Sequence, residues 1–155
     1  MRPFAEASVE VCNSLLGFFP DRGDLAACPI LATTQQVSAV CGIGGHVEGF
    51  VMLSMSARTA SQIAGKLCGT PVVTFDTHAA SAIAEFANII GGRSLTLLAG
   101  SGLVCTLTPP TIIRGVGTPV EGGSGLALRI PLILSHWGAM DVLVSIQGVE
   151  RRAAS

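Results

Sequence analysis

Charged side chains are scarce in this chain: they make up 12% of its 155 residues, and the formal net charge at pH 7 is −1. Binding to nucleic acid or to an anionic membrane surface depends on clustered Lys and Arg, so we expect neither as a partner. Apolar residues reach 49%, which excludes a disordered chain. So little charge beside so many apolar residues also favours an extensive protein-covered surface, such as a homodimer interface.

Long apolar runs and cysteine patterns are missing as well. The mean hydropathy is +0.61, but every apolar run is interrupted well before the roughly 18 residues that a membrane span needs. The first residues carry Glu6 and Glu10 and no long apolar core, so they do not resemble a signal peptide. Five cysteines, an odd number without CxxC spacing, favour a reduced cytoplasmic protein in which cysteines are small packing residues.

Motifs of the common catalytic and nucleotide-binding sites are absent too. The chain has no G-x-S-x-G nucleophile elbow, no GxGxxG and no phosphate-binding loop. The glycine-rich segments 42–45 and 122–125 are therefore interpreted as turns. The three histidines, His46, His78 and His136, are not placed within ligand distance of one another, so no metal site is expected.

Three helices are predicted from apolar periodicity and from capping residues. They cover residues 4–16, 57–67 and a long segment from residue 77 onward. Ser56 and Asp76 stand at the N-cap positions of the last two, where their side chains accept hydrogen bonds from free backbone N–H groups. Gly91 and Gly92 either end or bend the third helix, and residues 94–98 continue it.

Alternating or β-branched segments around these helices predict strands. They cover residues 30–40, 47–55, 103–107, 111–114, 126–134 and 140–146, the last two as an antiparallel hairpin. Residues 18–24 are predicted as a turn, and Trp137 in the hairpin turn either anchors a partner or folds back on the sheet. The order predicts an α+β fold, a mixed, mostly antiparallel sheet with helices packed on it, in one domain over residues 1–149. Residues 150–155 are predicted as a flexible tail, and a weak echo between the halves is compatible with a pseudo-symmetric duplication.

The third helix concentrates polar groups on one narrow stripe. At about 100° per residue, the stripe and the opposite apolar face separate cleanly. The stripe holds His78, Ser81, Glu85, Asn88 and Gly92, and the apolar face holds Ile83, Ala87 and Ile90, flanked by Ala79 and Phe86. Glu85 and Asn88 are three residues apart, so both side chains leave the same face.

Two interpretations of Glu85 and Asn88 are open from the pattern alone. The first is a solvated helix face. The second is a functional pair, which is favoured because charge is scarce and because Asn inside a helix is about 0.5 kcal/mol less favourable than Ala. His78 either lines the same contact surface or has a capping or solvent-exposed role.

Several segments, in this order and spacing, resemble the CheC/CheX/FliY family of chemotaxis phosphatases. They are Ser81-x-x-x-Glu85-x-x-Asn88, the run Asn88–Gly92, the earlier glycine-punctuated run Gly45–Met55, and the later run Leu107–Gly115 with Pro109-Pro110. The complete Ser-x-x-x-Glu-x-x-Asn motif occurs once and the chain is short, which is more similar to CheX than to CheC.

The resemblance implies a phosphatase that accelerates hydrolysis of the phospho-aspartate on a CheY-like response-regulator receiver domain. By position, Asn88 would orient the attacking water and Glu85 would pair with the receiver's active-site lysine, while Ser81, His78, Ile89 and Gly92 contact the partner. The Mg²⁺ belongs to the receiver, so the chain needs no cofactor of its own, and a homodimer with joined sheets is implied. The alternatives are a non-catalytic receiver-binding or scaffold module and a structural domain related to flagellar switch components.

Overall fold

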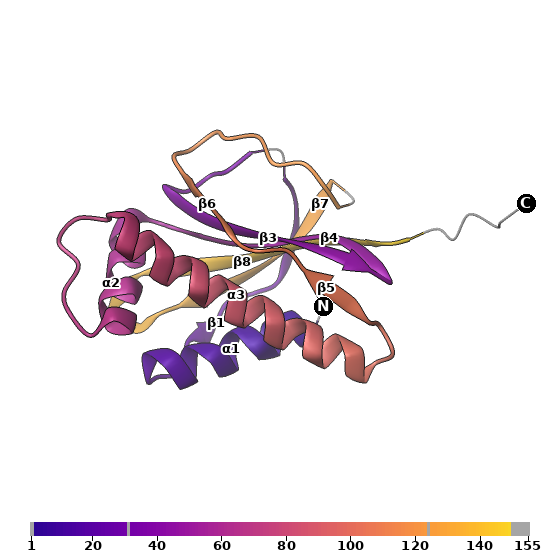
Figure 1. The fold of residues 1–155 in the computed structure, drawn as a ribbon, viewed down its shortest axis with the longest axis horizontal. Helices are drawn as coiled ribbons and strands as arrows, with labels where there is room; N and C mark the ends of the chain where they lie inside the picture. The colour runs from indigo at the N-terminus through magenta and orange to yellow at the C-terminus, as the bar shows by residue number, and fades with distance from the viewer. Residues whose placement is uncertain (1, 31, 124, 150–155) are drawn as a thin grey trace, which may run out of the picture.

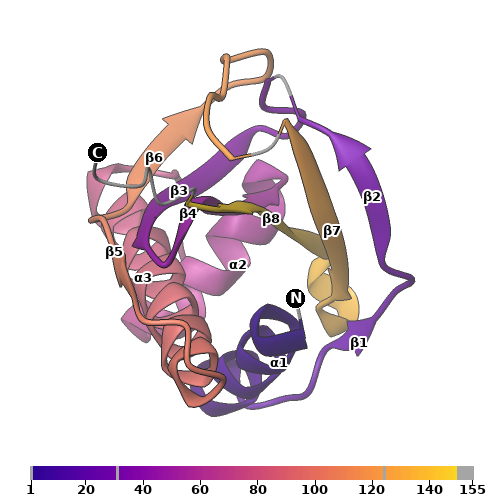
Figure 2. The same cartoon turned by 90° about the vertical axis from the view of Figure 1, so that its right-hand side faces the viewer.

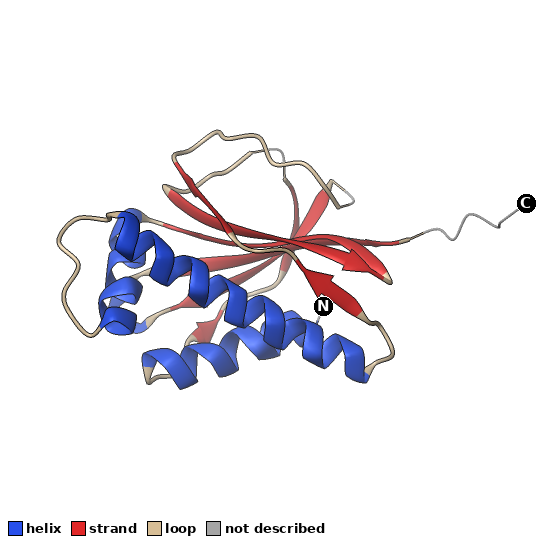
Figure 3. Ribbon diagram, viewed as in Figure 1, coloured by secondary structure: helices blue, strands red, loops and turns tan. Residues whose placement is uncertain are grey.

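Three helices lie on one face of an eight-stranded sheet in the computed structural model, which describes residues 2–30, 32–123 and 125–149 (Figures 1 and 3). The helices are α1 (Arg2–Leu16), α2 (Ala57–Cys68) and α3 (Thr77–Gly100). The strands are β1 (Asp21–Arg22), β2 (Ala26–Pro29), β3 (Val37–Gly45), β4 (Val47–Met55), β5 (Cys105–Leu107), β6 (Thr111–Arg114), β7 (Leu126–Ile133) and β8 (Ala139–Gly148). The tail predicted at 150–155 lies outside the described residues.

The sheet order is β1-β7-β8-β4-β3-β5, with β2 also paired to β7 and β6 also paired to β3. Every pairing among the described strands is antiparallel, so the predicted α+β class is confirmed. Figure 2 shows the sheet curving around the helices, with β5 and α3 on one flank and β7 and β2 on the other. The pseudo-symmetric duplication stays a prediction.

The strand predicted over residues 30–40 is wrong in its first half. β3 begins at Val37 and runs through the glycines at 42–45, which were predicted as a turn. Residues 33–36 instead form a loop held by Thr33, whose N–H donates to the carbonyl of Thr118 at 2.9 Å and whose Oγ1 accepts from the Thr118 N–H at 3.0 Å. The predicted turn at 18–24 contains β1, and β2 follows it, because both pair with β7 from far along the chain.

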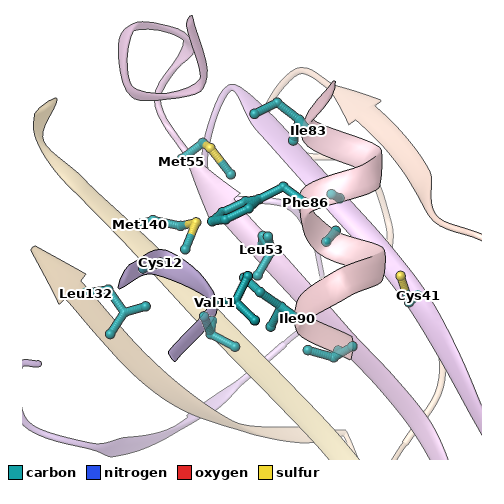
Figure 4. Close-up of a cluster of buried hydrophobic side chains, with 14 of the residues drawn as sticks. Val11, Cys12, Cys41, Leu53, Met55, Ile83, Phe86, Ile90, Leu132 and Met140 are labelled. Atoms are coloured by element: carbon teal, nitrogen blue, oxygen red, sulfur yellow. The ribbon is translucent and has the colours of Figure 1, made fainter. Parts of the chain in front are cut away.

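The third helix is continuous through Gly91 and Gly92, so the alternative that these glycines end it is wrong. Its apolar face forms the centre of the core, where Ile83, Phe86 and Ile90 are fully buried (Figure 4). Cys12 of α1 packs in the same cluster, and burial raises the pKa of its thiol to about 12. This cysteine therefore acts as a small apolar packing residue, as predicted.

Trp137 folds back rather than standing free. It lies in a short 3₁₀ turn, Ser135–Trp137, is half-buried, and meets the ring of Phe18 edge-on with centroids 5.1 Å apart. Among the described residues, no helix is both long and apolar enough to cross a membrane.

Candidate functional site

The polar stripe of α3 points away from the core. The Asp76 carboxylate caps the helix by accepting from the Ala79 N–H at 2.9 Å. From there the stripe residues are all exposed along consecutive turns: His78, Ser81, Glu85, Asn88 and Gly92. The Ser81 hydroxyl donates to the Thr77 carbonyl at 3.0 Å, so it is tied to its own helix. The opposite face is buried in the core, which makes α3 a fixed platform for the stripe.

Glu85 and Asn88 lie together in an open hollow of about 380 Å³. One wall is α3, which contributes Ser81, Ala84, Glu85 and Asn88. The other wall comes from the end of β5 and the turn after it, and contains Leu107, Pro109 and Pro110. A carboxylate and a carboxamide thus face an apolar wall, which is a suitable arrangement for a partner's polar group carried on an apolar stem.

The apolar wall is pinned to the sheet. Thr108 accepts a hydrogen bond from the Gly42 N–H through its Oγ1 at 2.7 Å and donates its own N–H to the Gly42 carbonyl at 2.9 Å. Leu107, beside it, is paired with Ile43 of β3. Because β3 is an inner strand, the position of the two prolines next to α3 is fixed by the sheet.

Neither Glu85 nor Asn88 has a side-chain hydrogen bond or an ion pair with any residue that the structure describes. A carboxylate without a cation offers a docking point for a positively charged group. A carboxamide presents an accepting oxygen and a donating nitrogen, which together hold a water in one orientation. The hollow therefore has the groups needed to place a water and a cation side by side.

The other predicted contact residues lie around the hollow without lining it. His78 is one turn before Ser81 on the stripe, and Gly92 is one turn after Asn88, both exposed. Ile89 is half-buried at the flank of the stripe and packs against the core.

The sequence reasoning missed a second Glu-x-x-Asn pair, Glu10 and Asn13 on α1. Its spacing equals that of Glu85 and Asn88, and a scan for this spacing alone would have found it. In the structure this pair is not free to bind a partner in the same way. The Glu10 carboxylate accepts a hydrogen bond from Arg93 Nε of α3 at 2.8 Å, and Asn13 is half-buried. The contribution of Leu107 to the hollow was missed too, because it depends on contact between distant segments.

A larger hollow, of about 490 Å³, lies between α2, the loop that follows it, and Trp137. Lys66 is its one charged side chain, and it has neither a carboxylate nor an imidazole. This hollow is larger than the one on α3, but it has no carboxylate paired with a carboxamide, so we place the site on α3. In the part of the chain that the structure describes, no group of three or more His, Cys, Asp and Glu residues is arranged to hold a metal ion.

Comparisons with known proteins agree with the fold. The family model of the chemotaxis phosphatase CheX matches residues 37–132, more than half of the 155 residues. The CheY-P phosphatase CheX of Thermotoga maritima is 26% identical over 139 residues, which span 89% of this chain and 89% of the relative.

Two solved structures align over nearly the whole chain. The chemotaxis protein CheX from Desulfovibrio desulfuricans is 23% identical, with a TM-score of 0.83 over 96% of this chain and 97% of that one, and supports the fold. A chain of the CheX-CheY-BeF3-Mg+2 complex from Borrelia burgdorferi is 27% identical, with a TM-score of 0.78 over 94% of this chain and 96% of that one. The chain therefore belongs to the CheX family of chemotaxis phosphatases.

Proposed function

We propose that this protein accelerates hydrolysis of the phospho-aspartate of a CheY-type receiver domain. The observation that carries the proposal is the exposed pair Glu85 and Asn88, which lie side by side on α3 in a hollow and have no side-chain partner among the described residues. The relative from Thermotoga maritima, named a CheY-P phosphatase, and the CheX-CheY complex from Borrelia burgdorferi support it at the level of the family.

Asn88 positions the water in this mechanism. Its carboxamide oxygen accepts a hydrogen bond from the water, which turns the water oxygen toward the phosphorus in line with the bond that breaks. The water forms the new P–O bond while the bond from phosphorus to the aspartyl oxygen breaks, which releases inorganic phosphate and the free carboxylate. Hydrolysis of this kind depends mainly on positioning and charge stabilisation, so a neutral amide is sufficient and a strong base is not required.

Glu85 docks the partner. Its carboxylate pairs with the active-site lysine of the receiver, as the resemblance to the family implies, and so fixes the register of α3 across the phosphorylated site. The Mg²⁺ that neutralises the phosphoryl oxygens belongs to the receiver, and this chain supplies no metal ligand in the mechanism. The Ser81 side of α3 and the flanking His78, Ile89 and Gly92 complete the docking surface.

The same proposal includes a cytoplasmic homodimer. The low charge content supports a protein-covered surface, and the exposed edges of the sheet provide backbone groups for joining a second copy. Sedimentation or light scattering of the purified protein measures the dimer, and a monomer at all concentrations would contradict it.

The decisive experiment follows the loss of phosphate from CheY-type receivers of the same genome after phosphorylation with acetyl phosphate. Addition of this protein shortens the lifetime of the phospho-aspartate, and addition of the Asn88→Ala variant does not. A non-catalytic receiver-binding module would bind the receiver and leave the lifetime unchanged. A structural domain of the flagellar-switch type would not bind it at all.

A further inference from the structure

Gly91 lies where α3 meets the apolar wall of the hollow. It is buried, although glycine is disfavoured inside a helix. A Cβ added at this position would lie 2.7 Å from Leu107 Cδ2 and 3.2 Å from Leu107 Cδ1. The next residue, Gly92, has nothing within 4 Å of such a Cβ, so the two adjacent glycines have different reasons to be there.

Leu107 has two ways to respond to a side chain at position 91, and both change the hollow. Its tip atoms can turn away, but Leu107 itself lines the hollow, so its new rotamer alters the lining. Alternatively the end of β5 can move away from α3. That movement opposes the pairing of Leu107 with Ile43 and the two hydrogen bonds between Thr108 and Gly42. The absence of a side chain at Gly91 thus leaves room for the observed position of Leu107 against α3.

We propose that Gly91 is a positioning residue for receiver binding: by seating Leu107 against α3, it sets the distance of the Leu107–Pro110 wall from Glu85 and Asn88. The inference rests on the proposed function and adds the element that fits the hollow to its partner. Glu85 and Asn88 stay on the same continuous helix whatever happens to the wall, so the chemical step is unaffected. The wall acts on docking, where it contributes equally to the ground state and to the transition state.

The test measures KM and kcat for dephosphorylation of a CheY-type receiver phosphorylated with acetyl phosphate. Gly91→Ala is expected to raise KM by about fivefold or more with kcat unchanged, because a wall displaced by a fraction of an ångström loses its fit. Gly100→Ala is the matched control, since it makes the same change at the far end of α3, where a Cβ meets nothing within 4 Å. It is expected to leave both constants unchanged.

Shortening Leu107 supplies the readout that a purely structural role would not give. Leu107→Val lacks the two Cδ atoms, so the double variant Gly91→Ala/Leu107→Val is expected to lower KM again by at least about threefold relative to Gly91→Ala, as contacting residues couple. Leu107→Ala, which weakens the wall and leaves the sequence of α3 unchanged, raises KM on its own. This single variant tests the wall even if Gly91→Ala does not fold.

Three results would overturn the inference: an unchanged KM in Gly91→Ala, a loss confined to kcat, or a rise in KM that Leu107→Val does not relieve. If wild-type protein shortens the phosphate lifetime and Gly91→Ala behaves identically, only this inference fails. If wild-type protein does not shorten it, the proposed function fails. The inference is then decided by the Kd for the receiver activated with beryllium fluoride, which Gly91→Ala must weaken.

Discussion

Two helices of this molecule carry a Glu and an Asn three residues apart, and their surroundings differ completely. On α3, Glu85 and Asn88 are exposed in a hollow and have no side-chain partner among the described residues. On α1, Glu10 is bound by Arg93 and Asn13 is half-buried. The spacing alone therefore does not define a site. What matters is which groups the neighbouring residues leave free, and whether a second wall faces them.

The ion pair on α1 is weak but sufficient to distinguish the two pairs. Its side chains are 50% and 44% exposed, so the attraction is largely screened by water. A partner's cation would nevertheless have to displace a guanidinium that lies 2.8 Å from the Glu10 carboxylate. At Glu85 no described residue competes for that position, and the apolar wall of Leu107, Pro109 and Pro110 adds a surface for the partner.

The largest effect is expected from Asn88→Ala. Loss of the carboxamide removes the group that orients the water, and stimulated dephosphorylation falls by about 100-fold or more, as expected when a reactant is no longer positioned. The measurement is the rate of phosphate loss from the receiver at saturating protein. Asn13→Ala on α1 is the matched control and keeps the full rate. Equal rates for Asn88→Ala and wild type would remove the basis for a difference between the helices.

Glu85→Ala is expected to act on docking more than on chemistry. Loss of one partner of a charge pair across an interface costs about 2 kcal/mol or more, so KM rises by about 30-fold. Titration of the rate with receiver concentration measures it. The wild-type KM also rises with ionic strength, because salt screens the pair, whereas the KM of the Ala variant responds less. A KM insensitive both to salt and to this substitution would contradict a docking role.

The outward stripe of α3 could be predicted because helical periodicity and the Asp76 cap are local features of the sequence. The same holds for β4 and for β6, whose predicted bounds match. The first half of the strand predicted at residues 30–40 failed for a non-local reason: hydrogen bonds between Thr33 and Thr118 hold this segment in a loop.

The hollow itself could not be predicted in the same way. Leu107 and the two prolines reach α3 only because β5 pairs with β3. No pattern in residues 103–110 predicts that β3 is the strand with which they pair. A glycine inside a helical pattern is a sign of close packing, so Gly91 was the available signal, but the residue it meets depends on the tertiary fold.

Substitutions of Glu10 and Asn13 on α1 test directly whether the two Glu–Asn pairs differ in function, and they are expected to change the kinetic constants little. The double variant Glu10→Ala/Asn13→Ala is expected to keep kcat and KM within about twofold of wild type, because neither side chain lines the hollow on α3. Arg93→Ala in the Asn88→Ala background, which frees the Glu10 carboxylate, is expected to restore no activity, since α1 presents no fully exposed Asn. A gain of phosphatase activity in that background would show that the ion pair was all that separated the two helices.

The smallest effect is expected on stability, from Arg93→Ala. Arg93 Nε and Glu10 join α3 to α1 at the surface, and exposed pairs of this kind contribute about 0 to 1 kcal/mol to the free energy of unfolding. Urea denaturation of wild type and variant measures the difference at low and at high salt. Arg2→Ala is the control, because Arg2 pairs with Glu6 within α1 and its side chain is 88% exposed, so its loss costs less. A cost well above about 1 kcal/mol that persists in high salt would mean that Arg93 holds α1 to α3 through packing of its alkyl stem, and that Glu10 is held by a structural constraint instead of a weak surface pair.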